Sequence, residues 1–304
     1  MKISVTGATG FIGSSVVKEL IGAGHQVLGL ARSDSGAKSL IAAGAEVHRG
    51  SLEDLESLRS GAAASDAAIH TAFVHNFSKF AENCEIDKHA IEALGSVLEG
   101  SERPFIVTSG TAGLAAPGQV ATEDDNTPPN FPFPRVSEQM ALALVPKGVK
   151  ASVMRLPQVH DTTKQGLVTY LIAVAREKGV SAYVGEGCNR WSAAHVLDVA
   201  RLYRLALEKH EVGAKYHAVA EEGVAMQDIA EAIGRGLKVR VVSLSPEQAQ
   251  AHFGWLSMFA NNDLRASSAQ TRRKLGWNPT GPGLIADLER LSYFAEASPS
   301  ASLR

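Results

Sequence analysis

The sequence predicts an α/β protein with a doubly wound parallel sheet and a smaller α/β part at its C-terminal end. Three observations predict this class. Short apolar runs alternate with helical segments in the first half, this rhythm changes near residue 160, and 304 residues suffice for one large domain and one small one. We therefore expect a first domain over residues 1–160, a smaller part over 161–296 with segments that can return to the first domain, and a mobile tail over 297–304.

The elements of the first half follow from the spacing of their apolar residues. Residues 2–6 alternate between apolar and polar side chains and stop at Gly7, which predicts a strand, whereas residues 11–23 repeat apolar side chains at the helical period, which predicts a helix. Further strands are expected at 27–30, 45–48, 67–70, 105–108 and 151–154, and further helices at 83–98 and 136–144. Because right-handed crossovers join such strands, they form a parallel sheet covered on both faces.

The second half has less regular elements. Helices are expected at 166–178 and within 191–209, and strands at 216–219 and 239–244. A proline-rich run at 127–134 is expected to span the rim of a cleft as a rigid loop. We interpret the second half as a smaller part that shares this cleft with the first domain.

Composition and charge exclude several classes of partner. The formal net charge of −2 offers no electrostatic footprint for nucleic acid or an anionic membrane surface. Cys84 and Cys188 form neither a disulfide framework nor a zinc-finger spacing. The chain shows no signal peptide and no run of roughly 18 apolar residues. We therefore expect a cytoplasmic protein that binds a small molecule and neither nucleic acid nor a membrane.

Residues 6–13 read TGATGFIG, directly after the first expected strand and at the start of the first expected helix. Gly7 permits a tight turn, Gly10 lets the backbone approach a pyrophosphate, and Gly13 lets the helix pack closely on the strand. The amides of the helix N-terminus favour phosphate binding. This context predicts a Rossmann-type dinucleotide site whose contacts in the turn are Gly7, Thr9, Gly10, Phe11, Ile12 and Gly13.

At this point the chain resembles a known family. TGATGFIG matches the TGxxGxxG pattern of the extended and atypical short-chain dehydrogenase/reductases, the epimerase/dehydratase-like group. Further matching segments are Gly24-His25, Ile69–Ala72, Val107–Ser109, Arg155–Pro157 and Trp191–Ala200. The resemblance covers nearly the whole chain, up to about Asp287. It implies an NAD(P)-dependent oxidoreductase that acts on a small molecule, with a homodimer as the family-level expectation.

The end of the second expected strand bears on the choice of nicotinamide cofactor. NAD-binding folds usually carry an acidic residue there, but this chain has Ala31 followed by Arg32 and Ser33. A guanidinium suits a 2′-phosphate, and the Ser33 hydroxyl or amide can add a bond. NADP(H) is therefore favoured over NAD(H). The alternative is that Arg32 is solvated and Asp34 holds the ribose.

The resemblance implies further cofactor contacts. Relatives place Gly-Asp-Leu beside the adenine, and here Ser51 precedes Leu52 in place of the aspartate. The backbone of the segment after the fourth strand lines the ribose in relatives, and the segments after the fifth and sixth strands flank the nicotinamide. The residues implied are Leu52, His70, Thr71, Ala72, Thr108, Leu156 and Pro157. His70 lacks partners at metal-ligand spacing, so no metal site is expected.

The usual catalytic pair of the family is missing. These enzymes use Tyr-xxx-Lys, in which the tyrosine moves a proton and the lysine lowers its pKa and holds the ribose. Counting back from Arg155 puts Pro134 at the tyrosine position and Glu138 at the lysine position, and none of the five tyrosines has a lysine four residues on. The pattern resembles the atypical subgroups, with Asp87 near the family's usual asparagine.

Other groups are therefore candidates for the chemistry. Ser109 and Thr111 follow the fifth strand and can bind a carbonyl oxygen, or they can simply cap their own loop. His160 is a candidate proton donor because imidazole titrates near neutrality. Lys164, Tyr170 or a positioned water are alternatives. His195 and Asp198 are interpreted as structural, and Phe253, Trp255, Phe259 and Tyr170 as pocket or core aromatics.

The sequence thus favours an NADP(H)-dependent oxidoreductase that reduces a carbonyl, or oxidises the alcohol, of a small apolar substrate without the Tyr-Lys pair. Two alternatives stay open. The missing pair also suits a catalytically silent NADP-binding sensor. An epimerase or dehydratase of nucleotide sugars is the third hypothesis, although no arginine clamp for a sugar diphosphate stands out.

Overall fold

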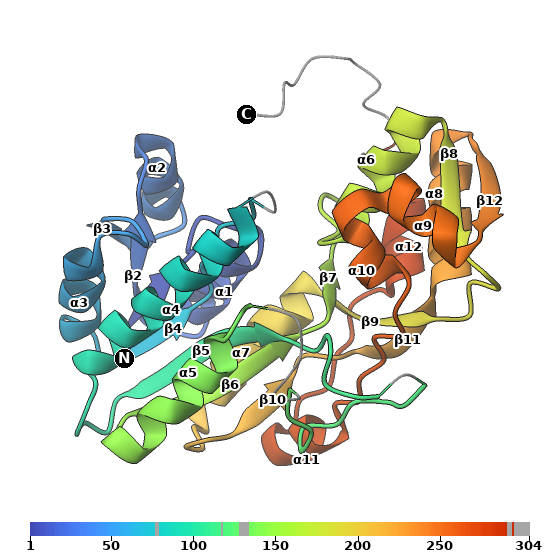
Figure 1. Ribbon diagram of the computed structural model, residues 1–304. Helices are drawn as coiled ribbons and strands as arrows, with labels where there is room; N and C mark the ends of the chain where they lie inside the picture. Colours follow the sequence, from blue (N-terminus) through green and yellow to red (C-terminus); the bar gives the residue numbers. More distant parts are fainter. Residues whose placement is uncertain (77–78, 117, 128–133, 291–293, 295–304) are drawn as a thin grey trace.

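The computed structural model describes residues 1–76, 79–116, 118–127, 134–290 and 294, which form two lobes (Figure 1). The larger lobe holds a seven-stranded sheet of order β10-β6-β5-β4-β1-β2-β3 in which every pair is parallel. Its strands are β1 (Lys2–Thr6), β2 (Gln26–Ala31), β3 (Glu46–Arg49), β4 (Ala67–His70), β5 (Pro104–Gly110), β6 (Lys150–Leu156) and β10 (Lys215–His217). The predicted doubly wound parallel sheet is confirmed.

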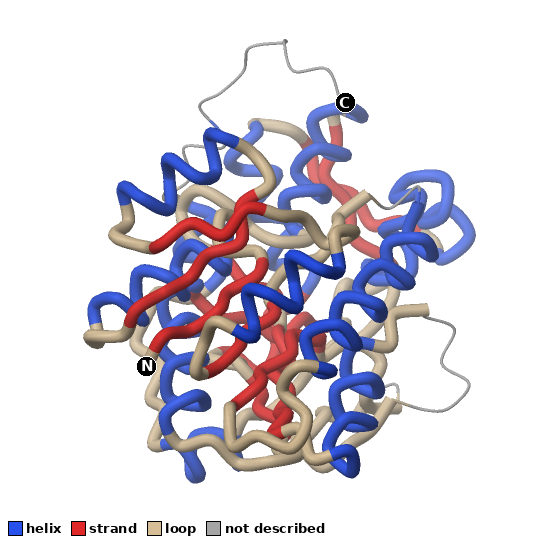
Figure 2. Tube along the Cα trace, turned by 90° about the vertical axis from the view of Figure 1, so that its left-hand side faces the viewer, coloured by secondary structure: helices blue, strands red, loops and turns tan. Residues whose placement is uncertain are grey.

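Helices cover both faces of this sheet, as Figure 2 shows from the side. One face packs against α1 (Phe11–Gly22), α2 (Asp34–Ala42) and α7 (Val196–Glu208), and the other against α3 (Leu55–Ala63), α4 (Phe80–Ser96) and α5 (Ser137–Leu144). A short 3₁₀ turn, η2 (Val145–Lys147), extends α5. Side chains cap α2 and α3, because Ser33 accepts from the Gly36 amide and Asp54 from the Ser57 amide. No side chain of the described residues caps α1.

The smaller lobe contains two short sheets, β11-β9-β7 and β12-β8, and a separate apolar core. Its strands are β7 (Gln158–His160), β8 (Val180–Val184), β9 (Arg190–His195), β11 (Glu221–Ala225) and β12 (Arg240–Leu244). Its helices are α6 (Val168–Lys178), α8 (Met226–Leu237), α9 (Pro246–Phe253), α10 (Ser257–Ala260) and α12 (Leu284–Glu289), with η3 (Gly254–Leu256) between α9 and α10; α11 (Ala269–Leu275) lies near β10.

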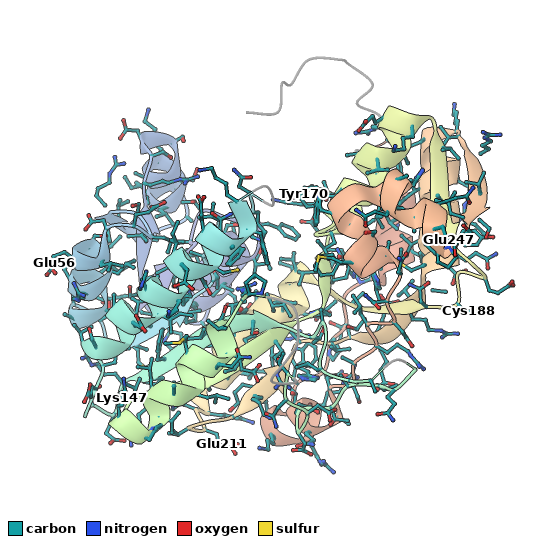
Figure 3. The ribbon with its side chains drawn as sticks, viewed as in Figure 1. Glu56, Lys147, Tyr170, Cys188, Glu211 and Glu247 are labelled. Carbon is teal, nitrogen blue, oxygen red and sulfur yellow. The ribbon has the colours of Figure 1, made fainter. Side chains whose placement is uncertain are left out.

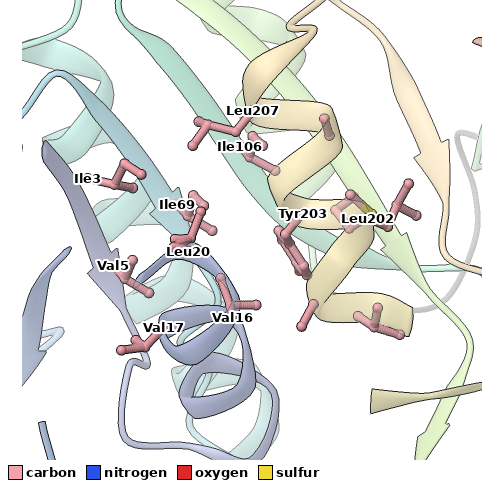
Figure 4. Close-up of a cluster of buried hydrophobic side chains, with 14 of the residues drawn as sticks. Ile3, Val5, Val16, Val17, Leu20, Ile69, Ile106, Leu202, Tyr203 and Leu207 are labelled. Carbon is pink, nitrogen blue, oxygen red and sulfur yellow. The ribbon is translucent and has the colours of Figure 1, made fainter. Parts of the chain in front are cut away.

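Two elements beyond residue 160 belong to the larger lobe. Strand β10 extends the large sheet beside β6, and α7 packs along α1. Figure 4 shows the core between α1, α7 and the sheet; its labelled side chains, all buried, are Ile3, Val5, Val16, Val17, Leu20, Ile69, Ile106, Leu202, Tyr203 and Leu207. Full burial of a side chain of this size contributes about 1.5–3 kcal/mol. This core therefore fixes α1 against β1 and β4.

Two predictions fall partly or wholly outside the described residues. The tail over 297–304 lies outside them, as do residues 128–133 of the proline-rich run. None of the helices in the described ranges combines the length and the apolar character that a bilayer crossing requires.

Candidate functional site

A cavity of about 670 Å³ opens at the carboxyl ends of the parallel strands and reaches the smaller lobe. The order of the strands reverses between β1 and β4, and a doubly wound sheet binds its ligand at such a switch point. Predicted site residues that line the cavity are Gly7, Thr9, Gly10, Phe11, Ile12, Gly13, Arg32, Leu52, Thr71, Ala72, Thr108, Ser109, Thr111, Leu156 and Pro157. Ser33, His70 and His160 do not line it.

The glycine turn has the geometry of a phosphate cradle. Gly7 has φ of 68°, and a Cβ there would lie 2.7 Å from the Ala72 amide nitrogen. A Cβ on Gly13 would lie 2.0 Å from the Gly7 carbonyl oxygen, so the helix could not approach the strand as it does. Gly10 is the N-cap residue of α1, and no side chain of the described residues caps the first amides of the helix. The residues present therefore fit the diphosphate of a dinucleotide.

The end of β2 places Arg32 in the cavity wall and turns its neighbours away. Ser33 caps α2 through Gly36, whose amide nitrogen lies 3.1 Å from Ser33 Oγ, and Ser33 is not among the residues that line the cavity. A bond from its hydroxyl or amide to a ribose phosphate stays a prediction. Asp34 also lies outside the wall, with its Oδ1 2.6 Å from the Arg49 guanidinium. Arg32 is therefore the charged group that this loop offers to the ribose end.

The segment that follows β4 places Thr71 and Ala72 in the cavity wall, but not His70, which was expected among the cofactor contacts. His70 is fully buried below the cavity, where its Nδ1 lies 2.8 Å from Thr6 Oγ1 and its Nε2 3.1 Å from Asp87 Oδ1. Thr108 Oγ1 donates to the His70 carbonyl oxygen at 2.6 Å. Strand residues alternate between faces, so Thr71 and Ala72 line the cavity beyond the strand end while His70 points into the interior.

The three catalytic candidates lie in different environments. Ser109 is half-buried in the cavity wall, and its hydroxyl makes no hydrogen bond within the described residues. Thr111 also lines the wall, but it is buried, with Oγ1 3.4 Å from both Leu156 O and Ser192 Oγ. His160 is fully buried outside the wall, and its Nδ1 lies 2.7 Å from Asp287 Oδ2 of α12. Burial lowers the pKa of His160 even though the Asp287 carboxylate opposes this.

His160 is therefore a structural link between β7 and α12, and the structure does not support it as a proton donor. Its imidazole belongs to the polar interior of the smaller lobe. Asp198 also has a structural place, because it accepts from the Gly281 amide at 2.7 Å and the Thr280 amide at 3.1 Å.

Sequence counting missed two residues of the cavity wall, Arg135 and Gln139, and expected Glu138 between them. Glu138 turns away from the cavity and is buried against Arg155, with Oε2 2.7 Å from Nε and Oε1 2.5 Å from Nη2. The side chains that line the cavity are Arg135 and Gln139, one residue further along and also four apart. The sequence signal that could have identified Arg135 and Gln139 is their separation of four residues, which is also the separation in the Tyr-xxx-Lys pattern.

Arg135 is held by a chain of buried hydrogen bonds. Its Nε donates to Ser137 Oγ at 2.8 Å, and Ser137 Oγ donates to Asp87 Oδ2 at 2.5 Å. Its Nη2 donates to the Thr108 carbonyl oxygen at 3.2 Å, and the guanidinium lies 4.2 Å above the Phe73 ring. Burial opposes ionisation of Asp87, but its hydrogen bonds and neighbouring charges hold its pKa below the usual value. Asp87 therefore anchors Arg135 as a carboxylate.

The smaller lobe supplies the far wall of the cavity. Tyr170 lies between the lobes (Figure 3), with its ring 5.2 Å from that of Trp255, and burial raises its pKa. Of the four aromatic residues considered from the sequence, Tyr170 and Phe259 line the wall, whereas Phe253 is buried in the core. Within the described residues no group of three His, Cys, Asp or Glu side chains could hold a metal ion.

Comparison with known proteins agrees with this architecture. The model of the NAD dependent epimerase/dehydratase family matches residues 3–220. The uncharacterised protein C2A9.02 of Schizosaccharomyces pombe is 49% identical over 97% of this chain and 100% of its own length. YLL056C of Saccharomyces cerevisiae, also uncharacterised, is 46% identical over 96% of this chain and 99% of its own length.

Solved structures share the fold. UDP-glucose 4-epimerase of Thermus thermophilus, in complex with NAD, superposes with a TM-score of 0.74 at 19% identity, covering 98% of this chain and all of that one. The segment that the family model matches begins at β1 and includes the glycine turn and the whole large sheet as far as β10. The chain therefore belongs to the NAD dependent epimerase/dehydratase family.

Proposed function

We propose that this protein is an NADP(H)-dependent oxidoreductase that reduces the carbonyl group of a small, largely apolar molecule or oxidises the corresponding alcohol. One observation carries the proposal. A single cavity joins the open start of α1, the Arg32 side chain and the Ser109 hydroxyl. A cofactor and a substrate can therefore meet in it. The dinucleotide contacts, the NADP preference and the chemical roles below are parts of this proposal.

The cofactor half of the cavity supports NADP(H). Amides at the start of α1 favour the diphosphate, and Arg32 favours a phosphate on the adenosine ribose. Asp34, the alternative ribose ligand, is paired with Arg49 instead. The cavity wall after β2 therefore presents a guanidinium and no aspartate, which favours NADP(H) over NAD(H).

Replacing Arg32 with alanine tests this preference. A charge-assisted hydrogen bond is worth about 1.5–3 kcal/mol, so we expect the Kd for NADPH to rise about 10- to 100-fold while that for NADH changes little. Fluorescence titration with both coenzymes measures the effect. Arg59→Ala is the matched control, because Arg59 lies on α3, outside the cavity wall, and pairs with Glu56 at 3.2 Å. If Arg32→Ala raised the Kd for NADPH and the Kd for NADH by the same factor, Arg32 would not be the ligand of the 2′-phosphate.

The substrate half supports stabilisation of a developing oxyanion. When bound, the dihydronicotinamide supplies a hydride to a carbonyl carbon, and negative charge then develops on the oxygen. Ser109 can donate a hydrogen bond to that oxygen, and the Arg135 guanidinium is fixed on the adjacent Thr108 carbonyl. Because guanidinium stays protonated at neutral pH, Arg135 stabilises charge rather than donating a proton. A proton must reach the same oxygen to complete the alcohol, and Lys164 or Tyr170 of the wall, or a positioned water, can supply it.

Replacing Ser109 with alanine tests the chemical role. We expect kcat/KM for carbonyl reduction to fall about 100-fold, as for loss of one oxyanion donor, with the Kd for NADPH unchanged. NADPH absorbance with a panel of ketones, aldehydes and quinones gives the rates. Ser243→Ala, an exposed hydroxyl on β12, is the control. Tight NADPH binding without turnover of any panel member would refute the enzyme and favour the NADP-binding sensor.

A further inference from the structure

The charges along the cavity are unequally distributed. Its described lining carries three basic side chains, Arg32, Arg135 and Lys164, and a single carboxylate, Glu53. Arg32 and Glu53 follow β2 and β3, on one side of β1, whereas Arg135 contacts the end of β5 on the other side. The carboxylate therefore lies at the end where the proposed function places the adenosine ribose. The substrate end holds cations without an acidic residue in its wall.

Lys164 lacks a partner of opposite charge. It lies in the segment between β7 and α6, with Nζ 5.8 Å from the centre of the Phe11 ring, and no carboxylate of the described residues lies within ion-pair distance of it. The neighbouring Asp161 is turned into its own loop, where Oδ1 accepts from the amides of Thr163 at 2.6 Å and Lys164 at 2.7 Å. The ammonium group is therefore available to a ligand.

Among the described residues, the counter-charge of Arg135 is Asp87, which lies behind the cavity wall. Asp87 is 1% exposed and lies 3.9 Å from Arg135 Nε, but its oxygens already accept from Ser137 and face His70. The guanidinium uses Nε and Nη2 for protein hydrogen bonds. Nη1 of Arg135 makes no hydrogen bond within the described residues. Because the side chain lies in the cavity wall, Nη1 can donate to a ligand.

Arg135 and Lys164 act on the same part of the cavity. The Arg135 guanidinium lies 4.2 Å above the Phe73 ring, and the centre of that ring lies 5.4 Å from the centre of the His75 ring. Lys164 lies 5.8 Å from the centre of the Phe11 ring in the same wall. Both charges add to the effect of burial in lowering the pKa of His75. Two cations in one cavity wall attract an anion. The surrounding wall is apolar and aromatic, with Phe73, Phe80, Tyr170, Trp191, Phe259 and Leu264.

We propose that the substrate is an oxo acid: an apolar body that carries the reacting carbonyl and also a carboxylate, which binds between Lys164 and the free edge of Arg135. This inference rests on the proposed function and names its substrate class. A carboxylate forms charge-assisted hydrogen bonds with both groups, and partial exclusion of water by the aromatic wall strengthens them. The cofactor diphosphate is the other anion that Lys164 could reach, since Phe11 begins α1.

The experiment compares each of several alkyl and phenyl 2-oxo and 4-oxo acids with its methyl ester under NADPH oxidation. We expect kcat/KM to be at least 30-fold higher for the preferred acid than for its ester. Equal or faster reduction of the esters overturns the oxo-acid inference and leaves the proposed function standing. If the acids, their esters and neutral ketones and aldehydes are all left unreduced, both the oxo-acid inference and the proposed function are wrong.

A charge-neutral variant then locates the contact. Lys164→Met should lower kcat/KM for the acid at least about tenfold more than for its methyl ester, leave the Kd for NADPH unchanged, and be rescued by Lys164→Arg. Lys147→Met is the matched control, because Lys147 is exposed on the larger lobe away from the cavity (Figure 3). A higher Kd for NADPH with an intact acid preference would show that Lys164 binds the cofactor diphosphate, and the assignment would be wrong.

Discussion

Gly13→Ala is expected to weaken NADPH binding at least 100-fold, a loss of about 2.8 kcal/mol. The new Cβ would lie 2.0 Å from the Gly7 carbonyl oxygen and 2.9 Å from Thr71 Oγ1. Gly7 cannot yield, because it has φ of 68° and its own Cα already faces the Ala72 backbone. The start of α1 must therefore move away from β1, and the amides that face the phosphates move with it. Fluorescence titration with NADPH and thermal unfolding measure the two consequences.

Gly22→Ala is the control on the same helix. Gly22 is the last residue of α1, and a Cβ there would meet no atom within 4 Å. Alanine at this position should leave coenzyme binding unchanged and raise the free energy of unfolding by about 0.5–1 kcal/mol, because alanine loses less conformational entropy than glycine in a helix. If Gly13→Ala bound NADPH within fivefold of the parent protein, the glycine turn would not be the phosphate site.

The fold was predictable where structure follows from local pattern. The period of the apolar residues located all six strands up to β6, and the helix expected at 11–23 is found at Phe11–Gly22. Short strands such as β7 (Gln158–His160) are specified by pairing with β9, which no local pattern contains. The position of β10 beside β6 is equally a long-range property. Local spacing could therefore predict the class of the sheet but not how the second half returns to it.

The candidate site was predictable as far as backbone contacts determine it. The glycine turn depends on close backbone approach, so residue type alone identified it. Side-chain direction was harder to predict. Counting back from Arg155 placed Pro134 and Glu138 on the helix expected to carry the catalytic pair, but α5 begins only at Ser137. Arg135 therefore enters the cavity from outside the helix, together with Gln139 on its first turn.

Glu138→Gln is expected to lower the free energy of unfolding by about 3–5 kcal/mol, because it removes one partner of a buried ion pair. Arg155 is fully buried, and both carboxylate oxygens of Glu138 accept from it. Urea unfolding measures the loss, and Glu56→Gln, whose side chain is 82% exposed, should change stability by less than about 1 kcal/mol. If Glu138→Gln and Glu56→Gln lowered the free energy of unfolding by similar amounts, the Glu138–Arg155 ion pair would not stabilise the fold as proposed.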